Sequence, residues 1–423
     1  MILLWALSPL GGQSALRLLQ VSPRLASANA TIRYLPIDAS SMTAMNGASG
    51  ALIGWPSYAS IYMTALITSR SQQNSSQDLF GNVRIPSLDS LTPPLTVGNQ
   101  SWTTVNYSQE IPYSSMLGIP VVGIPVTGNL SFNIVSRYLA IDCNTAIHVA
   151  NSTVFQNTSA GEGAGFSTYD EGGNFIIQRG GYPSPALAND TIASFNLTSP
   201  NGPGTDDVSF VNCSMAPRDV ESSIFCSDQS CQVTAMRNLT VDLSSWWNTD
   251  FPDISISFGF LPLTTVGVVN HGSKMTSSLT EMWLQDPDSS FVAEAFGEFA
   301  NLSQLPLPTL SRNFEVLYNT YWQSTYGAQY LFGNLSTDMS LYNNISGAVF
   351  GEPVIDFNTS QVTITSSDGE QYACNMTFAA FLLIISCLLF LAGIASLVLM
   401  SMTLAQIFWV MCPRTRGITR LRN

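Results

Sequence analysis

The longest apolar stretch of the chain lies near its C-terminal end. Residues 378–411 contain no Asp, Glu, Lys, Arg or His, and a bilayer core of ~30 Å needs only about 20 apolar residues in a helix. We therefore expect a transmembrane helix at residues 378–400, in contact with the lipid bilayer, and the pattern allows it to extend to residue 411. A buried core helix is the alternative, but such helices seldom carry so long an uncharged run.

The segments on the two sides of this run differ in charge. Residues 412–423 carry four arginines and no acid, whereas residues 1–377 carry 28 acidic and 11 basic residues, a net charge of −17. Short basic flanks stay cytoplasmic, so residues 412–423 are expected to be a cytoplasmic tail and the N-terminal side to be lumenal or extracellular, in either the plasma membrane or an endomembrane. The acidic side also disfavours nucleic acid as a partner, because the phosphate backbone requires cationic contacts.

The polar and apolar pattern upstream of the run predicts strands and helices. Short β-branched and aromatic segments between Gly and Asn turns predict strands, and they are 130–141, 153–155, 175–178, 208–213, 220–226, 232–237 and 361–365. Helical periodicity follows Pro56 and Asp288 and marks residues 314–328. We predict an α+β fold, in which a β-rich, disulfide-bonded, glycosylated ectodomain with peripheral helices over residues 29–377 precedes one C-terminal transmembrane helix.

The N-terminal segments are apolar but do not have the pattern of a membrane span. Residues 1–28 fit a signal peptide poorly, because they lack a basic start and are broken by a proline and two glycines. The uncharged segment 42–69 contains three glycines and Pro56. We expect it to hold a lumenal helix that starts at Pro56 and packs on a core, because proline suits the first helical position.

Asn-x-Ser/Thr sequons are unusually frequent. The chain has 16 of them, whereas random placement of its Asn, Ser and Thr residues would give about 6. Since a glycan needs a solvent-facing asparagine, the excess predicts a surface glycoprotein. Asn375 lies against the expected span and is expected to stay unmodified. The remaining sequons are at Asn29, Asn74, Asn99, Asn106, Asn129, Asn151, Asn157, Asn189, Asn196, Asn212, Asn238, Asn301, Asn334, Asn344 and Asn358.

Five cysteines precede the expected span, and in an oxidising compartment four of them should form two disulfides. Cys143, Cys213, Cys226 and Cys231 allow three connectivities. We favour Cys226–Cys231, which closes a tight loop, together with Cys143–Cys213, which ties two strands. Zinc binding is the alternative for such a cluster, but the spacing is not that of a zinc site and the chain has only two histidines.

The sequence contains no recognisable catalytic or cofactor-binding motif. The glycine-rich segment 161–165 does not connect a strand to a helix, and segment 267–274 has its Ser and Lys in the wrong order for a phosphate loop. A serine hydrolase would have to use His148 or His271 as its base, without a nucleophile elbow. Adjacent acids such as Asp206 and Asp207 fit solvated loops better than a glycosidase pair. We expect no catalytic residue, no metal and no cofactor.

Four segments carry a resemblance to a known group. They are WALSPLGGQS at 5–14, GNVRIP at 81–86, the cysteine group that ends in CQVTAMR at 231–237, and NTYWQS at 319–324. Through them the chain resembles a set of uncharacterised membrane proteins of filamentous ascomycete fungi, over nearly all of the ectodomain and the C-terminal span. Members of that set carry further membrane helices upstream of the first segment. The resemblance therefore implies either a sequence that starts late or a divergent member inserted by its C-terminal helix alone, and it implies no activity.

These patterns lead to a hypothesis and two alternatives. We expect a membrane-anchored glycoprotein with a non-catalytic binding or structural ectodomain, whose ligand is a protein or a glycan. The alternatives are the outer domain of a larger multi-span receptor or transporter, and a membrane-tethered hydrolase that uses a carboxylate pair.

Overall fold

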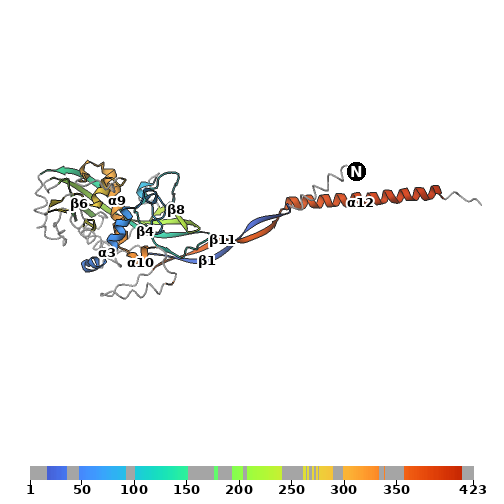
Figure 1. The fold of residues 1–423 in the computed structure, drawn as a ribbon, viewed down its shortest axis with the longest axis horizontal. Coiled ribbons are helices and arrows are strands. Elements are labelled where there is room, and N and C mark those ends of the chain that lie inside the picture. The colour runs from blue at the N-terminus through green and yellow to red at the C-terminus, as the bar shows by residue number, and fades with distance from the viewer. Residues whose placement is uncertain are drawn as a thin grey trace, which may run out of the picture. The chain divides into compact units, whose positions relative to one another are not determined.

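The structure, a computed structural model, describes residues 17–35, 47–91, 101–150, 176–179, 193–202, 207–240, 261–262, 264–265, 269–270, 273–274, 276–288, 299–332, 338 and 357–411. It contains a β-rich sheet with some helices and one C-terminal apolar helix (Figure 1). It also contains two disulfides. The chain divides into two compact units, of which one is residues 27–365 and the other combines residues 1–26 with 366–423.

The centre of the sheet is a long antiparallel pair, β4 (Asn129–Val149) and β7 (Val208–Ser227). Buried and half-buried side chains alternate along β7, as they do in a strand with one face on the core. The sequence predicted separate strands at 208–213 and 220–226, but β7 is continuous through Pro217. Among the described strands, β6 (Ala193–Pro200) and β8 (Ser230–Asn238) pair with the two ends of β7 and leave Pro217 with a partner on one side only. A proline can occupy such a position because its missing N–H removes no ladder hydrogen bond.

A two-residue turn joins β7 to β8. Asp228 and Gln229 form the turn with φ angles of 49° and 69°, which is the type I′ geometry that matches the twist of a hairpin. The Asp228 carboxylate also accepts a hydrogen bond from the N–H of Gly128, 3.0 Å away, at the start of β4.

The described strands form a nine-stranded sheet with the order β2-β8-β7-β4-β11-β1-β3, and β6 joins β5 to β7 beside this path. The strands not yet defined are β1 (Leu19–Tyr34), β2 (Thr103–Thr104), β3 (Val121–Val122), β5 (Ile176–Arg179) and β11 (Asn358–Cys374). A separate small hairpin consists of β9 (Val269–Asn270) and β10 (Ser273–Lys274). The predicted strand at 153–155 and the predicted helix after Asp288 lie outside the described residues.

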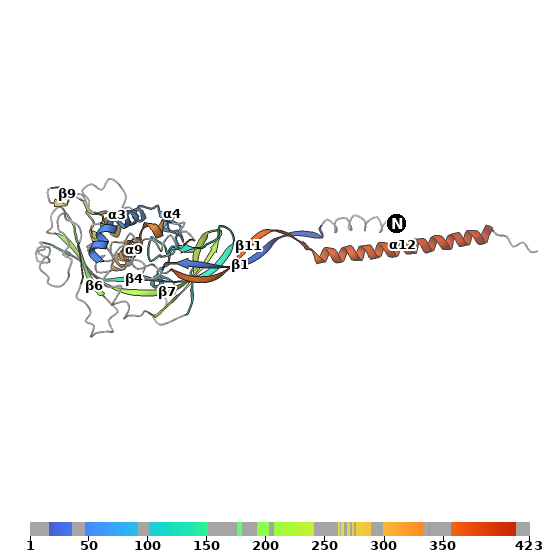
Figure 2. The ribbon, with the colours of Figure 1, turned by 90° about the horizontal axis from the view of Figure 1, so that it is seen from below.

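Helix α9 (Leu307–Ser324) packs on β4, and α3 (Gly47–Leu66) and α8 (Leu279–Gln285) pack on α9 (Figure 2). Fully buried tyrosines fill the space between α3 and α9, and the ring of Tyr321 meets that of Tyr62 edge to face at 5.5 Å. The expectation that α3 starts at Pro56 is wrong, because the helix begins at Gly47 and continues through the proline. A proline inside a helix removes only one backbone hydrogen bond, and the turns on both sides hold the helix together.

Among its described residues, the unit of residues 27–365 also contains the shorter helices α4 (Arg70–Gln73), η1 (Leu88–Ser90), η5 (Leu302–Gln304) and α10 (Ala328–Leu331). The predicted helix at 314–328 is divided between α9 and α10. Gly327 separates the two with a φ of 94°, a conformation that glycine adopts at little cost and that no helix can continue through.

The second unit contains the ends of β1 and β11 and the helix α12 (Met376–Met411). The backbone N–H of Asn375 donates to the carbonyl oxygen of Leu18 at 2.8 Å, directly before the helix begins. At 1.5 Å per residue the 36 residues of α12 extend about 54 Å. By length and composition alone, its segment Met376–Ile407 can cross a membrane.

Candidate ligand-binding pocket

Two polar side chains of α9 fix the helix against its neighbours. The side-chain amide of Asn319 accepts the N–H of Leu139 at 2.9 Å and donates to the carbonyl oxygen of the same residue at 2.8 Å. The hydroxyl of Thr320 accepts the N–H of Met116 at 2.9 Å. These contacts join α9 to β4 and to the segment 112–116, and they hold in place the elements that form a pocket.

The segment 78–84 is held by a buried carboxylate. Asp78 accepts backbone N–H groups from Phe80, Asn82 and Gly118, and also the side-chain amide of Asn82. Burial raises the pKa of Asp78, and these hydrogen bonds oppose the rise. At Gly118 a Cβ atom would lie 2.5 Å from the backbone of Asn82, so only glycine permits this approach. The arrangement fixes the backbone that carries Arg84.

Arg84 is a buried cation bonded to carbonyl oxygens. It donates to the carbonyl oxygen of Ser115 at 2.9 and 3.1 Å and to those of Gln73 and Ser75, and its guanidinium lies 4.0 Å from the centre of the Tyr113 ring. Burial lowers the pKa of Arg84 to about 10, so the side chain is charged at neutral pH. Within the described part of the chain, no carboxylate lies within ion-pair distance of it.

Arg84 lines a pocket of about 500 Å³ that also contains Arg70 and Arg312. Residues of α4, α8, α9 and the segment 110–116 surround it. The three arginines are three of the 11 basic residues that precede α12. Glu110 is the one acid among the described lining residues. A strongly acidic chain therefore places over a quarter of these cations in one pocket.

Arg312 connects the pocket to a buried carboxyl group. Its guanidinium donates to the carbonyl oxygen of Tyr113 at 2.7 Å and lies 3.4 Å from the carboxyl of Glu315, one helical turn along α9. Burial raises the pKa of Glu315 to about 7, although Arg312 opposes this rise. Burial also lowers the pKa of Arg312, while Glu315 opposes the change.

Arg70 is the most exposed of the three cations, with 55% of its side chain accessible. Its guanidinium lies 3.3 Å from the carboxylate of Glu110 and also pairs with Asp288. A second hollow of about 670 Å³ shares Arg70 and Gln73 with the first. Arg70 can therefore reach a ligand in either hollow without leaving its own position on α4.

The indole N–H of Trp283 is the one unsatisfied polar group of α8 that lies beside the pocket. Trp283 is 4% exposed and lines the pocket, and its N–H has no acceptor in the described part of the chain. The helix is fixed by a capping box, in which the Ser278 hydroxyl accepts the N–H of Glu281 and the Glu281 carboxylate accepts the N–H of Ser278. A buried donor without an acceptor costs about 1–3 kcal/mol.

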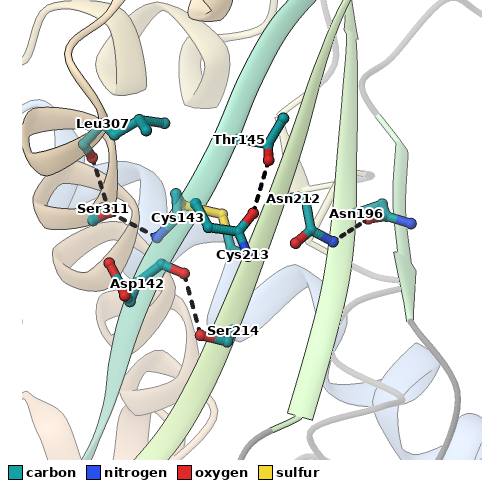
Figure 3. Close-up of a disulfide and its surroundings, with 10 residues drawn as sticks. Asp142, Cys143, Thr145, Asn196, Asn212, Cys213, Ser214, Leu307 and Ser311 are labelled. Atoms are coloured by element: carbon teal, nitrogen blue, oxygen red, sulfur yellow. Dashed lines mark hydrogen bonds between the residues drawn. A yellow bond between two sulfur atoms is a disulfide. The ribbon is translucent and has the colours of Figure 1, made fainter.

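The four predicted cysteines form the disulfides Cys143–Cys213 and Cys226–Cys231, the pairs that the spacing favoured. Each bridge joins residues that are directly opposite in antiparallel strands, with Cα–Cα distances of 3.9 and 4.0 Å. Figure 3 shows Cys143 held further by its N–H, which donates to the hydroxyl of Ser311 on α9 at 2.8 Å. All four cysteines are buried, so their role is to hold the sheet together.

The predicted glycosylation sites differ in exposure. Asn29, Asn74, Asn106 and Asn129 are exposed. Asn196 and Asn212 are opposite each other on β6 and β7, and the Asn212 amide donates to the Asn196 carbonyl oxygen at 2.7 Å (Figure 3). Half-buried positions are Asn196, Asn212, Asn238, Asn301, Asn358 and Asn375, and the sequons at Asn99, Asn151, Asn157, Asn189, Asn334 and Asn344 lie outside the described residues. Glycosylation at these positions, and its expected absence at Asn375, stay predictions.

Of the catalytic candidates that the sequence raised, the structure describes His148 and Asp207. His148 lies on β4 about half exposed, 4.0 Å from the carboxylate of Asp207. Among the described residues, no group of three or more His, Cys, Asp or Glu side chains could hold a metal ion. The segment 161–165 lies outside the described residues, as do Asp206 and His271.

The residues that line the pocket were not predicted from the sequence, although one of them, Arg84, lies in a segment that carries the resemblance described above. The segments 81–86 and 319–324 carry the resemblance described above, and they contain Arg84, Asn319 and Thr320. In the structure Asn319 and Thr320 make hydrogen bonds that position elements, and Arg84 does the same while lining the pocket. The small number of basic residues was a further indication of a site. The sequence could not show, however, which of the 11 basic residues that precede α12 would lie in one pocket.

Comparison of the chain with protein-family models, with curated proteins and with solved structures finds no match.

Proposed function

We propose that this protein is a membrane-anchored glycoprotein whose ectodomain is a non-catalytic binding domain, with the pocket around Arg84 and Arg312 as its ligand site. The observation that carries the proposal is the pocket itself, in which the buried Arg84 and the half-buried Arg312 lie beside aromatic and aliphatic side chains. Such a mixture of apolar walls with a few polar groups is typical of small-ligand sites.

The proposed anchor is α12, followed by the arginine-rich residues 412–423 in the cytoplasm. Its apolar length and the basic flank support this topology. The excess of sequons and the two disulfides support a lumenal or extracellular position for the rest of the chain.

Binding is favoured over hydrolysis by the carboxylates around the pocket. Glycoside cleavage needs two carboxyl groups that face each other across a sugar. Among the described lining residues the pocket has one, Glu110, which lies beside Arg70. The buried Glu315 bonds to Arg312 and does not line the pocket.

The proposal is tested with the full chain reconstituted in lipid nanodiscs and screened against immobilised glycans and secreted proteins. We expect saturable binding of at least one class, and loss of an electrophoretic mass shift after N-glycosidase treatment. Each ligand found is then incubated with the protein and analysed by mass spectrometry. Release of a cleaved or modified product would overturn the non-catalytic proposal.

A further inference from the structure

Two of the predicted glycosylation sequons occupy directly opposite positions on neighbouring strands. Asn196 on β6 is in register with Asn212 on β7, and the side-chain amide of Asn212 donates to the side-chain oxygen of Asn196 at 2.7 Å (Figure 3). Side chains at directly opposite positions lie on the same face of a sheet, with Cβ atoms about 4.5–5.5 Å apart. A glycan attached to one of these asparagines would therefore begin next to the other.

The sheet face that carries both asparagines is open to solvent. The next opposite pair on this face is Ser194 and Ser214, of which Ser194 is exposed and Ser214 is half-buried. Asp142, the partner of Ser214 on β4, is exposed as well. The other face is the buried one, since Phe195 and Cys213 are 0% and 1% exposed. A glycan on either asparagine would thus leave the sheet toward solvent, as its bulk and polarity require.

The hydrogen bond between the two amides distinguishes one asparagine from the other. A glycan is attached to the side-chain nitrogen of asparagine. That nitrogen of Asn212 is the donor of the pair, so a sugar there would replace one of its two hydrogens, 2.7 Å from the oxygen of Asn196. A sugar on the nitrogen of Asn196 would leave the Asn196 oxygen in place as the acceptor. The pair therefore accommodates a glycan on Asn196 while Asn212 remains an unmodified donor.

The sequon of Asn212 is also held by its neighbours. Its middle residue, Cys213, is bridged to Cys143, and its last residue, Ser214, donates its hydroxyl to a backbone carbonyl oxygen of β4 at 3.3 Å (Figure 3). Asn196 precedes Asn212 by 16 residues, so it is the first of the two to enter a lumenal compartment during synthesis. Both observations favour Asn196 as the modified residue.

We propose that this strand pair carries a single N-linked glycan, attached to Asn196, and that this glycan excludes one at Asn212. Two bulky glycans at directly opposite positions of one sheet face would overlap. The inference rests on the proposed function, because it requires this part of the chain to enter a glycosylating compartment. It narrows the sequence prediction, in which both asparagines are modified.

The test maps the glycans of the full chain, expressed in a eukaryotic host that glycosylates secretory proteins. N-glycosidase in water labelled with heavy oxygen converts each modified asparagine to a labelled aspartate. Trypsin then releases residues 180–218 as one peptide that contains both sites, so fragmentation in a mass spectrometer counts the labels on each molecule. We expect a label at Asn196 and none at Asn212. Labels at both sites of one peptide, at Asn212 alone or at neither site would overturn the inference.

Two variants remove the glycan of Asn196 in different ways. Asn196→Gln removes the asparagine itself, whereas Thr198→Ala destroys the sequon but keeps the Asn196 oxygen that accepts the hydrogen bond. Both variants should transfer the label to Asn212, because the excluding glycan is absent in each. An Asn212 that stays unlabelled in either variant would overturn exclusion by the glycan.

Asn129→Gln is the matched control. It removes an exposed sequon on β4, and the residue directly opposite on β7 is Ser227, which cannot carry an N-linked glycan. The label should therefore stay at Asn196 in this variant. Its transfer to Asn212 would show a general change in glycosylation and would overturn the inference.

The failure of this inference and that of the proposed function are distinguishable. Glycans at exposed sequons such as Asn29 and Asn129, without one at Asn196, would overturn the inference alone and would support the proposed glycoprotein. A chain without any glycan would overturn the glycoprotein part of the proposed function as well.

Discussion

The central strand pair and the pocket differ in how their charged side chains are paired. On β4 and β7, Arg137 and Asp219 are directly opposite each other and form a two-pronged ion pair with N–O distances of 2.6 and 2.9 Å. The two disulfides of the sheet join residues that are opposite in the same way. Beside the pocket, by contrast, Arg84 donates to carbonyl oxygens and lies 4.0 Å from the centre of the Tyr113 ring, and it has no carboxylate within ion-pair distance among the described residues.

The difference separates groups that hold the fold from groups that are available to a ligand. A side chain whose partners all belong to the chain contributes to stability, and its loss should appear in the free energy of unfolding. A buried donor or cation without a full set of partners lowers stability. Changes in the strand pair should therefore alter stability without altering affinity.

The largest effect is expected from the disulfide Cys143–Cys213. The bridge closes a loop of 70 residues, so replacing both cysteines by serine should lower the free energy of unfolding by about 4 kcal/mol because the unfolded chain gains entropy. Chemical denaturation under two-state conditions measures the change. The matched control is the pair Cys226→Ser and Cys231→Ser, which opens a loop of only 5 residues and should cost about 2 kcal/mol. Equal losses would contradict the prediction.

The next effect is a pH dependence caused by Glu315. Its pKa in the folded chain is about 7, against an ordinary value of 4.5. Below pH 4.5 both states are protonated. As pH rises from 4.5 to 7 the unfolded state loses the proton while the folded state keeps it, so the free energy of unfolding should fall by about 3 kcal/mol across this window.

Glu315→Gln should remove this decline, because glutamine has no proton to lose, and denaturation at pH 4.5, 6 and 7.5 measures the effect. Glu110→Gln is the control, and the decline should persist in it because Glu315 is still present. A decline that persists unchanged in Glu315→Gln would show that another group causes it.

A smaller loss is expected when the contact between α9 and β4 is removed. Asn319→Ala leaves both the N–H and the carbonyl oxygen of Leu139 without their side-chain partner, which should lower the free energy of unfolding by about 2 kcal/mol. Asn313→Ala is the control on the same helix, since it removes one hydrogen bond, to the carbonyl oxygen of Leu284, and should cost about half as much. A cost for Asn319→Ala no greater than that of the control would contradict the prediction.

The smallest effect is a gain in stability at the hairpin turn. Gln229 has a φ of 69°, which a residue with a Cβ adopts at a cost and glycine does not. Gln229→Gly should therefore raise the free energy of unfolding by about 0.5–1 kcal/mol. Asp228→Gly removes the same strain one residue earlier but also the hydrogen bond to Gly128, so it should give less stabilisation than Gln229→Gly. A loss of stability in Gln229→Gly would contradict the type I′ assignment.

The sequence allowed part of this fold to be predicted because some signals are local. The alternation of side chains at 130–141 lies within β4, and the apolar run from 378 lies within α12. The pair Cys226–Cys231 was favoured because its short spacing closes a tight loop, and the pair Cys143–Cys213 because it ties two predicted strands. The continuity of β7 through Pro217 could not be predicted, because it depends on which neighbouring strands pair on each side of that residue.

The pocket could not be predicted for the same reason. Arg70, Arg84, Tyr113, Trp283 and Arg312 belong to segments that are up to 242 positions apart in the chain and meet in one pocket. None of these segments has the spacing of a known binding motif, so no local pattern marks them as ligand-binding. Only the packing of α8, α9 and the segment 110–116 brings their side chains together.

The sequence by itself determined the apolar helix α12, the strand character of the central segments and the cysteines available for bridging. Each of these features depends on the composition of a segment or on a periodic pattern of side chains, and both can be read directly from the sequence. The tertiary structure decided which cations face a common pocket, which carboxyl group is buried beside them and which asparagines hold backbone groups rather than face solvent. These outcomes depend on distances between remote residues and on the loss of solvent around them, and burial is what turns an ordinary Glu315 into a carboxyl with a pKa near 7.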